Sequence, residues 1–129
     1  MPIVKLSMIK GRTATEKLNV VSGIHNALLE SFKIPEDDKN FRIMEFEKED
    51  YVLPPGKSEK YILIEMTIFP GRSIDAKRLL YRRVVENLNQ LGIDPKDIFI
   101  ILYEEPLDNW GVRGGHPASE IDIGFNLKV

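Results

Sequence analysis

Residues 11–17 read GRTATEK, and residues 71–77 read GRSIDAK. Both stretches carry a Gly-Arg-[Thr/Ser] turn with a lysine four residues after the hydroxyl residue. Each follows an apolar run typical of a strand and opens a segment whose apolar spacing is typical of a helix. Similarity at a fixed offset exposes the supersecondary unit from which a chain is built. The sequence therefore predicts a strand–turn–helix unit that is used twice.

The two copies continue to match beyond the helices. Residues 34–38, IPEDD, end the first helix, and residues 93–97, IDPKD, end the second. Strand-like runs follow at Phe41–Glu47 and Ile98–Glu104 and complete two β-α-β units. Two copies predict a duplicated domain, since a solenoid needs about three or more. The parts of this single domain (1–129) are repeat one (2–47), an exposed Pro- and Gly-containing linker (48–60), repeat two (61–104) and a C-terminal hairpin tail (105–129).

The helices and strands have recognisable ends and faces. Thr13 and Glu16 form a capping box that starts the first helix, which ends before Pro35. Ser73 caps the second helix, and Gly92 ends it. The residues predicted to be buried are Leu18, Val21, His25, Leu28 and Phe32 on the first helix, Leu80, Val84, Leu88 and Leu91 on the second, and Val4, Leu6, Met8, Ile62, Ile64, Met66 and Ile68 on two strands.

Strands joined by a helical crossover lie parallel. Two such units side by side predict an α/β (α+β) fold in which a four-stranded mixed sheet carries both helices on one face. The run Ile98–Tyr103 is apolar on both of its sides, so one layer of helices cannot cover it. We therefore expect the second face to be buried by association of subunits into a closed ring.

The composition excludes several classes of protein. A net charge of −2 with interspersed charges offers no surface for nucleic acid or an anionic membrane. The absence of cysteine excludes disulfides, thiol catalysis and cysteine-based zinc sites. No apolar run approaches the length of a membrane span, and the N-terminus does not resemble a signal peptide. We expect a soluble cytoplasmic protein that needs no metal or organic cofactor.

Proline at position 2 is a candidate catalytic group. A small second residue normally permits removal of Met1, which would leave Pro2 as a secondary amine. Free α-amino groups titrate near about 8, and burial or nearby cations lower that pKa toward the range of a general base. The alternative is that Pro2 only stiffens the start of a strand. The signatures of hydrolases, P-loops, dinucleotide sites and histidine metal sites are absent from the sequence.

Pro2 at a strand start, the Gly-Arg-[Thr/Ser] turn and the following helix together resemble the tautomerase superfamily. Residues 109–119 are similar to the glycine-rich hairpin that ends the 4-oxalocrotonate tautomerase unit. Residues 71–84 are similar to the malonate semialdehyde decarboxylase group. Short members of the superfamily have one β-α-β unit and form hexamers, whereas fused members have two and form trimers. The resemblance therefore implies a homotrimer.

The resemblance also implies roles for individual residues. Pro2 would carry the proton, and Arg72 would bind the substrate carboxylate with its planar guanidinium. Arg12 matches the arginine of single-unit enzymes, although fused members often leave this first copy unused. Three further residues match family positions, and each also has a structural alternative. Asp38 would be an acid that orients water, or else an ordinary turn residue. Trp110 would be a pocket wall or else hydrophobic cover, and His25 would bind substrate or else be a hydrogen-bonded core histidine.

One departure from the family pattern bears on the reaction. The decarboxylase and dehalogenase groups carry two arginines just before the second helix, whereas Phe69 and Pro70 precede Gly71-Arg72 here. The missing cation favours a neutral Pro2 amine and keto–enol tautomerisation of a small 2-oxo or enol carboxylate. Two alternatives remain open. One is a malonate semialdehyde-type decarboxylase or hydratase with a cationic Pro2, and the other is a non-catalytic trimeric binding protein.

Overall fold

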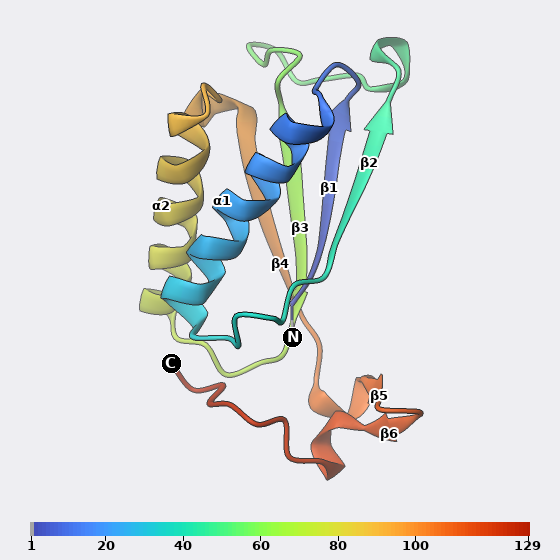
Figure 1. Ribbon diagram of the computed structural model, residues 1–129, viewed down its shortest axis with the longest axis vertical. Helices are drawn as coiled ribbons and strands as arrows, with labels where there is room; N and C mark the ends of the chain where they lie inside the picture. Colours follow the sequence, from blue (N-terminus) through green and yellow to red (C-terminus); the bar gives the residue numbers. More distant parts are fainter. Residues whose placement is uncertain (1) are drawn as a thin grey trace.

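The computed structural model describes residues 2–129. The first repeat contains β1 (Ile3–Ile9), α1 (Ala14–Phe32) and β2 (Phe41–Phe46), and the second contains β3 (Ile62–Ile68), α2 (Ile74–Gln90) and β4 (Ile98–Glu104) (Figure 1). The tail adds a short hairpin of β5 (Gly111–Val112) and β6 (His116–Pro117). Single 3-10 turns lie at η1 (Lys48–Asp50), η2 (Pro95–Asp97), η3 (Leu107–Asn109) and η4 (Ala118–Glu120).

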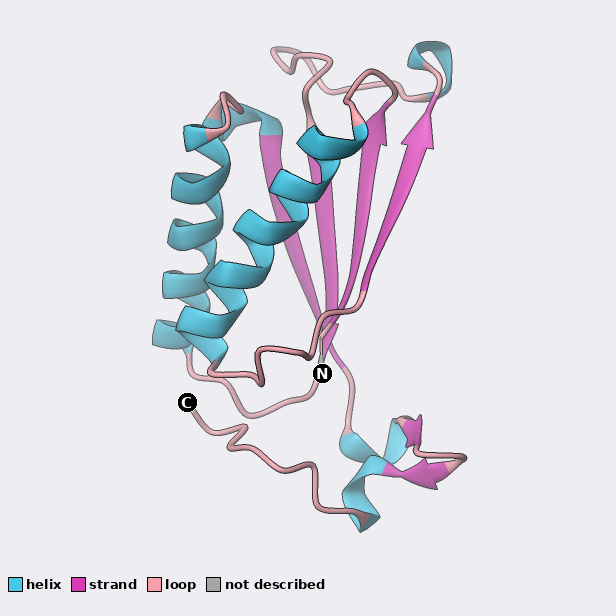
Figure 2. Cartoon of the chain, viewed as in Figure 1, coloured by secondary structure: helices cyan, strands magenta, loops and turns pink. Residues whose placement is uncertain are grey.

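The four long strands form one mixed sheet in the order β2-β1-β3-β4. β1 pairs parallel with β2, and β3 pairs parallel with β4, as the helical crossovers predict. The two repeats meet through the antiparallel pair of β1 and β3, in which Leu6 lies opposite Ile64. Both helices cover the same face of the sheet (Figure 2), which confirms the predicted architecture.

The core lies between the helix layer and the sheet. The alternating strand residues are confirmed, since Val4, Leu6, Met8, Ile62, Ile64, Met66 and Ile68 are all at most 1% exposed. Thr13 accepts the backbone N–H of Glu16, and Glu16 accepts that of Thr13, so the predicted capping box is present. Ser73 caps α2 through the backbone N–H of Ala76.

Two residues predicted to be buried are exposed. Leu18 is 64% exposed because Lys17 points to the sheet in its place and bonds to Glu45 of β2 at 2.9 Å. Leu91 is 43% exposed because α2 ends at Gln90 and the chain turns at Gly92. Ile93, which follows that turn, fills the core position instead and is 3% exposed.

In the described part of the chain, both helices lie on one face of the sheet, so its second face carries no helix (Figure 2). Its residues alternate with the core residues along each strand, and Phe99 and Tyr103 of β4 are 51% and 42% exposed. Lys5 and Tyr103 both contact Glu65 on this face. Within residues 2–129, the helices are too short or too polar to cross a membrane.

Candidate active site

The sheet topology gathers four segments at one end of the molecule. Because β1 and β3 are antiparallel, the start of β1, with Pro2, lies beside the end of β3, and Ile3 is paired with Thr67. The parallel partners add the residues before β2, since the Val4 N–H donates to the Asn40 carbonyl at 2.9 Å. They also add the end of β4, where Glu104 is paired with Ile68. Pro2, Asp38, Arg72 and the tail therefore belong to the same end.

Arg72 is a buried cation at this end and is 6% exposed. Its Nη1 donates to the Phe69 carbonyl at 2.9 Å, and its guanidinium carbon lies 4.9 Å from the centre of the Phe32 ring. Burial lowers the pKa of the Arg72 guanidinium, and the charges of Glu104 and Asp38 oppose that shift. The Nε–H is buried and has no hydrogen-bond partner. Arginine stays protonated, so Arg72 presents an unsatisfied charged donor.

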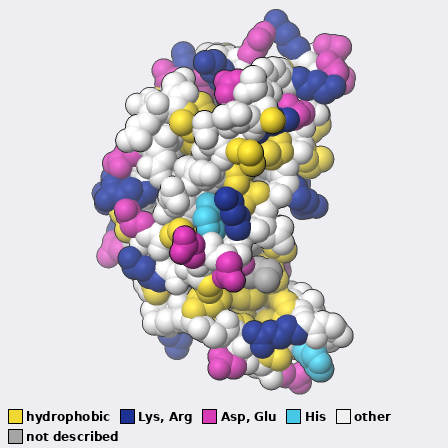
Figure 3. Space-filling model, viewed as in Figure 1, with side chains coloured by type: hydrophobic (Ala, Val, Ile, Leu, Met, Phe, Trp, Pro, Cys, Tyr) yellow, Lys and Arg dark blue, Asp and Glu magenta, His cyan; other side chains and the backbone are white. Residues whose placement is uncertain are grey.

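A cavity of about 360 Å³ opens between the turn that carries Asp38 and the C-terminal tail. Its walls are mostly apolar, with Phe69 and Phe125 among them, and Asp38 and Arg113 add charge. Trp110 is 8% exposed and stacks edge-on against Phe69 at 4.6 Å between ring centres, with Nε1 donating to the Glu105 carbonyl. Trp110 therefore supports a wall of the cavity through Phe69. Figure 3 shows the surface hollowed between the sheet and the tail, with hydrophobic side chains on both sides.

The end of the C-terminal tail covers both neighbours of Arg72. The Ser73 N–H donates to the Val129 carbonyl at 2.9 Å. At Gly71, whose φ is +120°, an added Cβ would lie 3.1 Å from the Leu127 carbonyl oxygen. The tail thus packs against the turn that carries Arg72, a contact that joins residues far apart in the sequence.

The turn before β2 carries Asp38 and also contacts His25. Asp38 is partly buried, and its N–H donates to the Pro35 carbonyl at 3.0 Å. His25 is 5% exposed, and its Nε2 lies 2.8 Å from the Glu36 carbonyl oxygen. His25 is therefore placed in the core as a hydrogen-bonded residue, behind the turn that carries Asp38.

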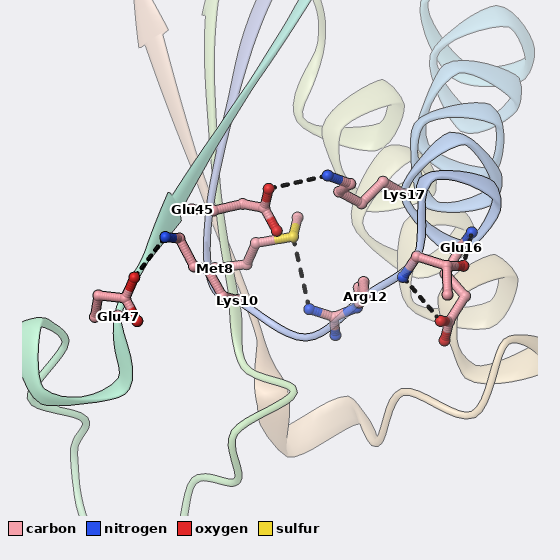
Figure 4. A network of polar contacts seen from close by, with 8 residues as sticks. Met8, Lys10, Arg12, Glu16, Lys17, Glu45 and Glu47 are labelled. Carbon is pink, nitrogen blue, oxygen red and sulfur yellow. Dashed lines mark hydrogen bonds and ion pairs between the residues drawn. The ribbon is translucent and has the colours of Figure 1, made fainter.

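Arg12 lies at the opposite end of the sheet, after β1, so a single chain does not bring it to Pro2. Its Nη2 donates to the Lys60 carbonyl at 2.7 Å, and its Nη1 lies 3.7 Å from the Met8 sulfur. Figure 4 shows Arg12 turned toward Met8, beside Glu16 and near the Lys17–Glu45 pair. Burial lowers the pKa of the Arg12 guanidinium, and the charges of Glu16, Asp97 and Glu45 oppose that shift.

Sequence reasoning missed three parts of the candidate site: Phe69, Arg113 and the tail residues from Ile121 to Leu127. The position of Phe69 just before Pro70-Gly71-Arg72 could have indicated that it belongs to the site, whereas no local pattern indicated the tail. Among the described residues, no group of three or more carboxylates and histidines is arranged to hold a metal ion. Met1, whose removal the Pro2 mechanism requires, lies outside the described residues.

Comparison with known proteins gives a consistent assignment. A family described as "Tautomerase enzyme" matches residues 38–113, and a second family with the same description matches residues 2–59. The probable tautomerase YusQ of Bacillus subtilis (strain 168) is 26% identical over 121 residues, which cover 89% of this chain and 95% of that protein. The probable tautomerase YrdN of the same organism is 23% identical over 116 residues, which cover 85% and 89%.

Solved structures share the fold. Malonate semialdehyde decarboxylase superposes with a TM-score of 0.82 at 23% identity, covering 89% of this chain and 93% of that one. A fused 4-OT, solved as a symmetric trimer, superposes with a TM-score of 0.79 at 22% identity, covering 91% and 96%. The duplicated β-α-β fold, the proline at position 2 and the two family matches agree: this chain belongs to the tautomerase family.

Proposed function

We propose that this protein is a cofactor-independent tautomerase that interconverts the enol and keto forms of a small 2-oxo carboxylate. The observation that carries the proposal is the state of Arg72, whose buried guanidinium has an Nε–H without a partner. A buried unsatisfied donor is costly, and a substrate carboxylate would satisfy it. The family assignment supports the same class of reaction.

In this mechanism Pro2 moves one proton within the substrate. With Met1 removed, the neutral Pro2 nitrogen takes the proton from the enol oxygen and leaves an enolate. The electrons of the C2–C3 double bond then take the same proton from the Pro2 ammonium at C3, while an oxygen lone pair completes the C2 carbonyl. Arg72 holds the carboxylate, and the apolar cavity walls exclude water, which strengthens the charge contacts. No cofactor takes part in either step.

The proposal includes a homotrimer. The helix-free face of the sheet exposes Phe99 and Tyr103, and a fused 4-OT with this fold is a trimer. Closing a ring of three subunits would bury this face against neighbouring subunits. The substrate is a small carboxylate, and no other partner is required.

A second candidate is hydration or decarboxylation of a 3-oxo acid of the malonate semialdehyde type. Asp38 lines the cavity and lies close enough to Arg72 to influence it electrostatically. A carboxylate in this place could orient a water molecule. This candidate requires a Pro2 amine that stays cationic at neutral pH, whereas tautomerisation requires a neutral amine.

The test combines intact mass with a ketonisation assay on phenylenolpyruvate. We expect a mass that lacks methionine, and a kcat/KM that falls at least about a hundredfold in Pro2→Ala and in Arg72→Ala. The control is Arg78→Ala, because Arg78 is exposed and pairs with Asp75 on the same helix turn. Unchanged rates in both site variants would reject the mechanism. A retained Met1 or an absence of turnover would favour a non-catalytic trimeric binding protein.

A further inference from the structure

His25 is a buried histidine whose ring is fixed on two sides. Its Nε2 lies 2.8 Å from the Glu36 carbonyl oxygen, and a carbonyl can only accept, so Nε2 carries the hydrogen. The ring also meets Phe41, the first residue of β2, edge-on at 6.3 Å between centres. These two contacts stand on either side of Asp38 in the sequence.

The segment between those contacts lies near the surface. Glu36 and Asp37 are exposed, and Asp38 is only partly buried. The Asp38 N–H bonds to the Pro35 carbonyl within the same turn. Beyond the turn, the Asn40 carbonyl accepts the Val4 N–H, two residues after Pro2. A shift of this turn would therefore move Asp38 and disturb the start of β1.

The histidine carries a cost that an apolar residue would avoid. Its Nδ1 is buried and has no hydrogen-bond partner, although His25 lies among apolar residues of α1 such as Ile24 and Leu28. Burying a polar atom without a partner is unfavourable. Packing alone would be served better by leucine at this position. What the imidazole adds is the hydrogen bond to Glu36.

We propose that His25 is a positioning residue that holds the Glu36–Asn40 turn and thereby fixes the Asp38 carboxylate relative to Arg72 and Pro2. The inference rests on the second candidate function proposed for that site, in which the Asp38 carboxylate orients a water molecule. His25 acts through the backbone and does not touch the substrate. The residue classified by resemblance as substrate-binding thus gains a different role.

The first test is amide hydrogen exchange on the full-length protein in its native assembly. In His25→Leu, which keeps the bulk and removes the donor, the Asp38 and Lys39 amides should exchange about tenfold faster. His25→Gln should restore slow exchange, because its amide nitrogen can reach the Glu36 carbonyl, whereas the shorter side chain of His25→Asn cannot. The matched control is Ser31→Ala, which removes a buried hydrogen bond within α1, from Ser31 to the Ala27 carbonyl.

The second test is a double-mutant cycle with Asp38→Asn, measured by turnover of a 3-oxo acid of the malonate semialdehyde type, the reaction in which Asp38 would orient water. We expect His25→Leu to lower kcat about tenfold with little change in KM, since Arg72 still binds the carboxylate. In the Asp38→Asn background the same substitution should have little further effect, because it acts through Asp38. Additive effects, or recovery of activity in His25→Asn as complete as in His25→Gln, would overturn the proposal.

These outcomes remain distinct from failure of the proposed function. Loss of the proposed function is read from Pro2→Ala and Arg72→Ala, whereas the exchange experiment needs no turnover. If His25→Leu does not fold, the Gln and Asn variants, which have the same chemistry and differ by one methylene, still decide the question. Equal exchange rates at Asp38 and Lys39 in those two variants would count against a positioning role.

Discussion

At the scale of single residues, the two copies of one motif have different surroundings. Arg72 follows β3 at the end of the sheet where Pro2 begins β1, and one of its donors is unsatisfied. Arg12 occupies the equivalent place after β1, but there the chain continues through the linker, and the Lys60 carbonyl accepts its Nη2. An uninterrupted chain supplies no free amine at that place. The duplication therefore yields one candidate active site per chain.

Asp97 offers a residue-scale prediction about pH. Its side chain is 2% exposed and accepts the Ser58 N–H at 2.8 Å and the Ser58 hydroxyl at 2.5 Å, which ties the linker to the start of β4. Burial raises the pKa of Asp97, but the hydrogen bonds from Ser58 and the nearby lysines outweigh it, so the pKa is lowered. Asp97→Asn should cost about 1–2 kcal/mol of unfolding free energy at pH 7.

The sign of the pH dependence follows from the lowered pKa. The stabilisation is complete above the pKa of about 3.9 that aspartate has in the unfolded chain, and it is lost as the pH falls through the lower folded value. The difference between wild type and Asp97→Asn should therefore shrink below about pH 4. Urea unfolding from pH 7 to pH 3 measures this, with the exposed Asp75→Asn as control. A difference that is constant with pH would contradict the assignment.

At the scale of elements, the turn from β3 to α2 is tied to the C-terminal tail. Gly11 and Gly71 both have positive φ values, +146° and +120°, and both precede the arginine of the repeated motif. Nothing lies within 4 Å of an added Cβ at Gly11, whereas one at Gly71 would approach the backbone of Leu127. At Gly11, therefore, only the backbone conformation favours glycine. At Gly71 the close contact with the tail favours it as well.

Substitution of these glycines gives a matched pair. Gly11→Ala should cost roughly 1–2 kcal/mol from the unfavourable φ alone. Gly71→Ala should cost more, and it should also lower kcat/KM, because the tail must move away from Arg72. Thermal unfolding and the phenylenolpyruvate assay on both variants test this expectation. Equal losses of stability, with activity retained in Gly71→Ala, would show that the tail contact is not needed.

At the scale of the whole molecule, a single chain leaves the helix-free face of the sheet exposed. Its exposed aromatic residues, Phe99 and Tyr103, lie on β4 at the edge of the sheet. Exposed apolar surface of this kind is typical of protein–protein contacts. A trimer would cover this surface.

Two single substitutions test the trimer, and each introduces one charge at an exposed position. Phe99→Glu on the open sheet face should lower the mass from that of a trimer toward that of a monomer at micromolar concentration, because a buried unpaired carboxylate is costly. Leu18→Glu is the control, since Leu18 is 64% exposed on the helix side. Size-exclusion chromatography with light scattering measures both variants. A wild-type protein that is monomeric would reject the proposed assembly.

The sequence by itself determined the repeated units, the starts of both helices and the buried faces of β1 and β3. These features depend on local rules: capping needs residues three apart, and side chains alternate along a strand whatever it pairs with. Errors arose at helix ends, where Lys17 faces the sheet in place of Leu18 and Ile93 enters the core in place of Leu91. There the direction of the helix relative to the sheet decides burial, and periodicity carries no information about that direction.

The tertiary structure gives the physical reason why Arg72, and not Arg12, lies at the same end of the sheet as Pro2. The antiparallel pairing of β1 with β3 brings the start of one strand to the end of the other, and so it selects Arg72 and leaves Arg12 at the far end. The bond from His25 to Glu36 and the contact of the tail with Gly71 are likewise products of folding. Each joins groups whose separation in the chain follows no period, so the physical reason for the contact exists only in three dimensions.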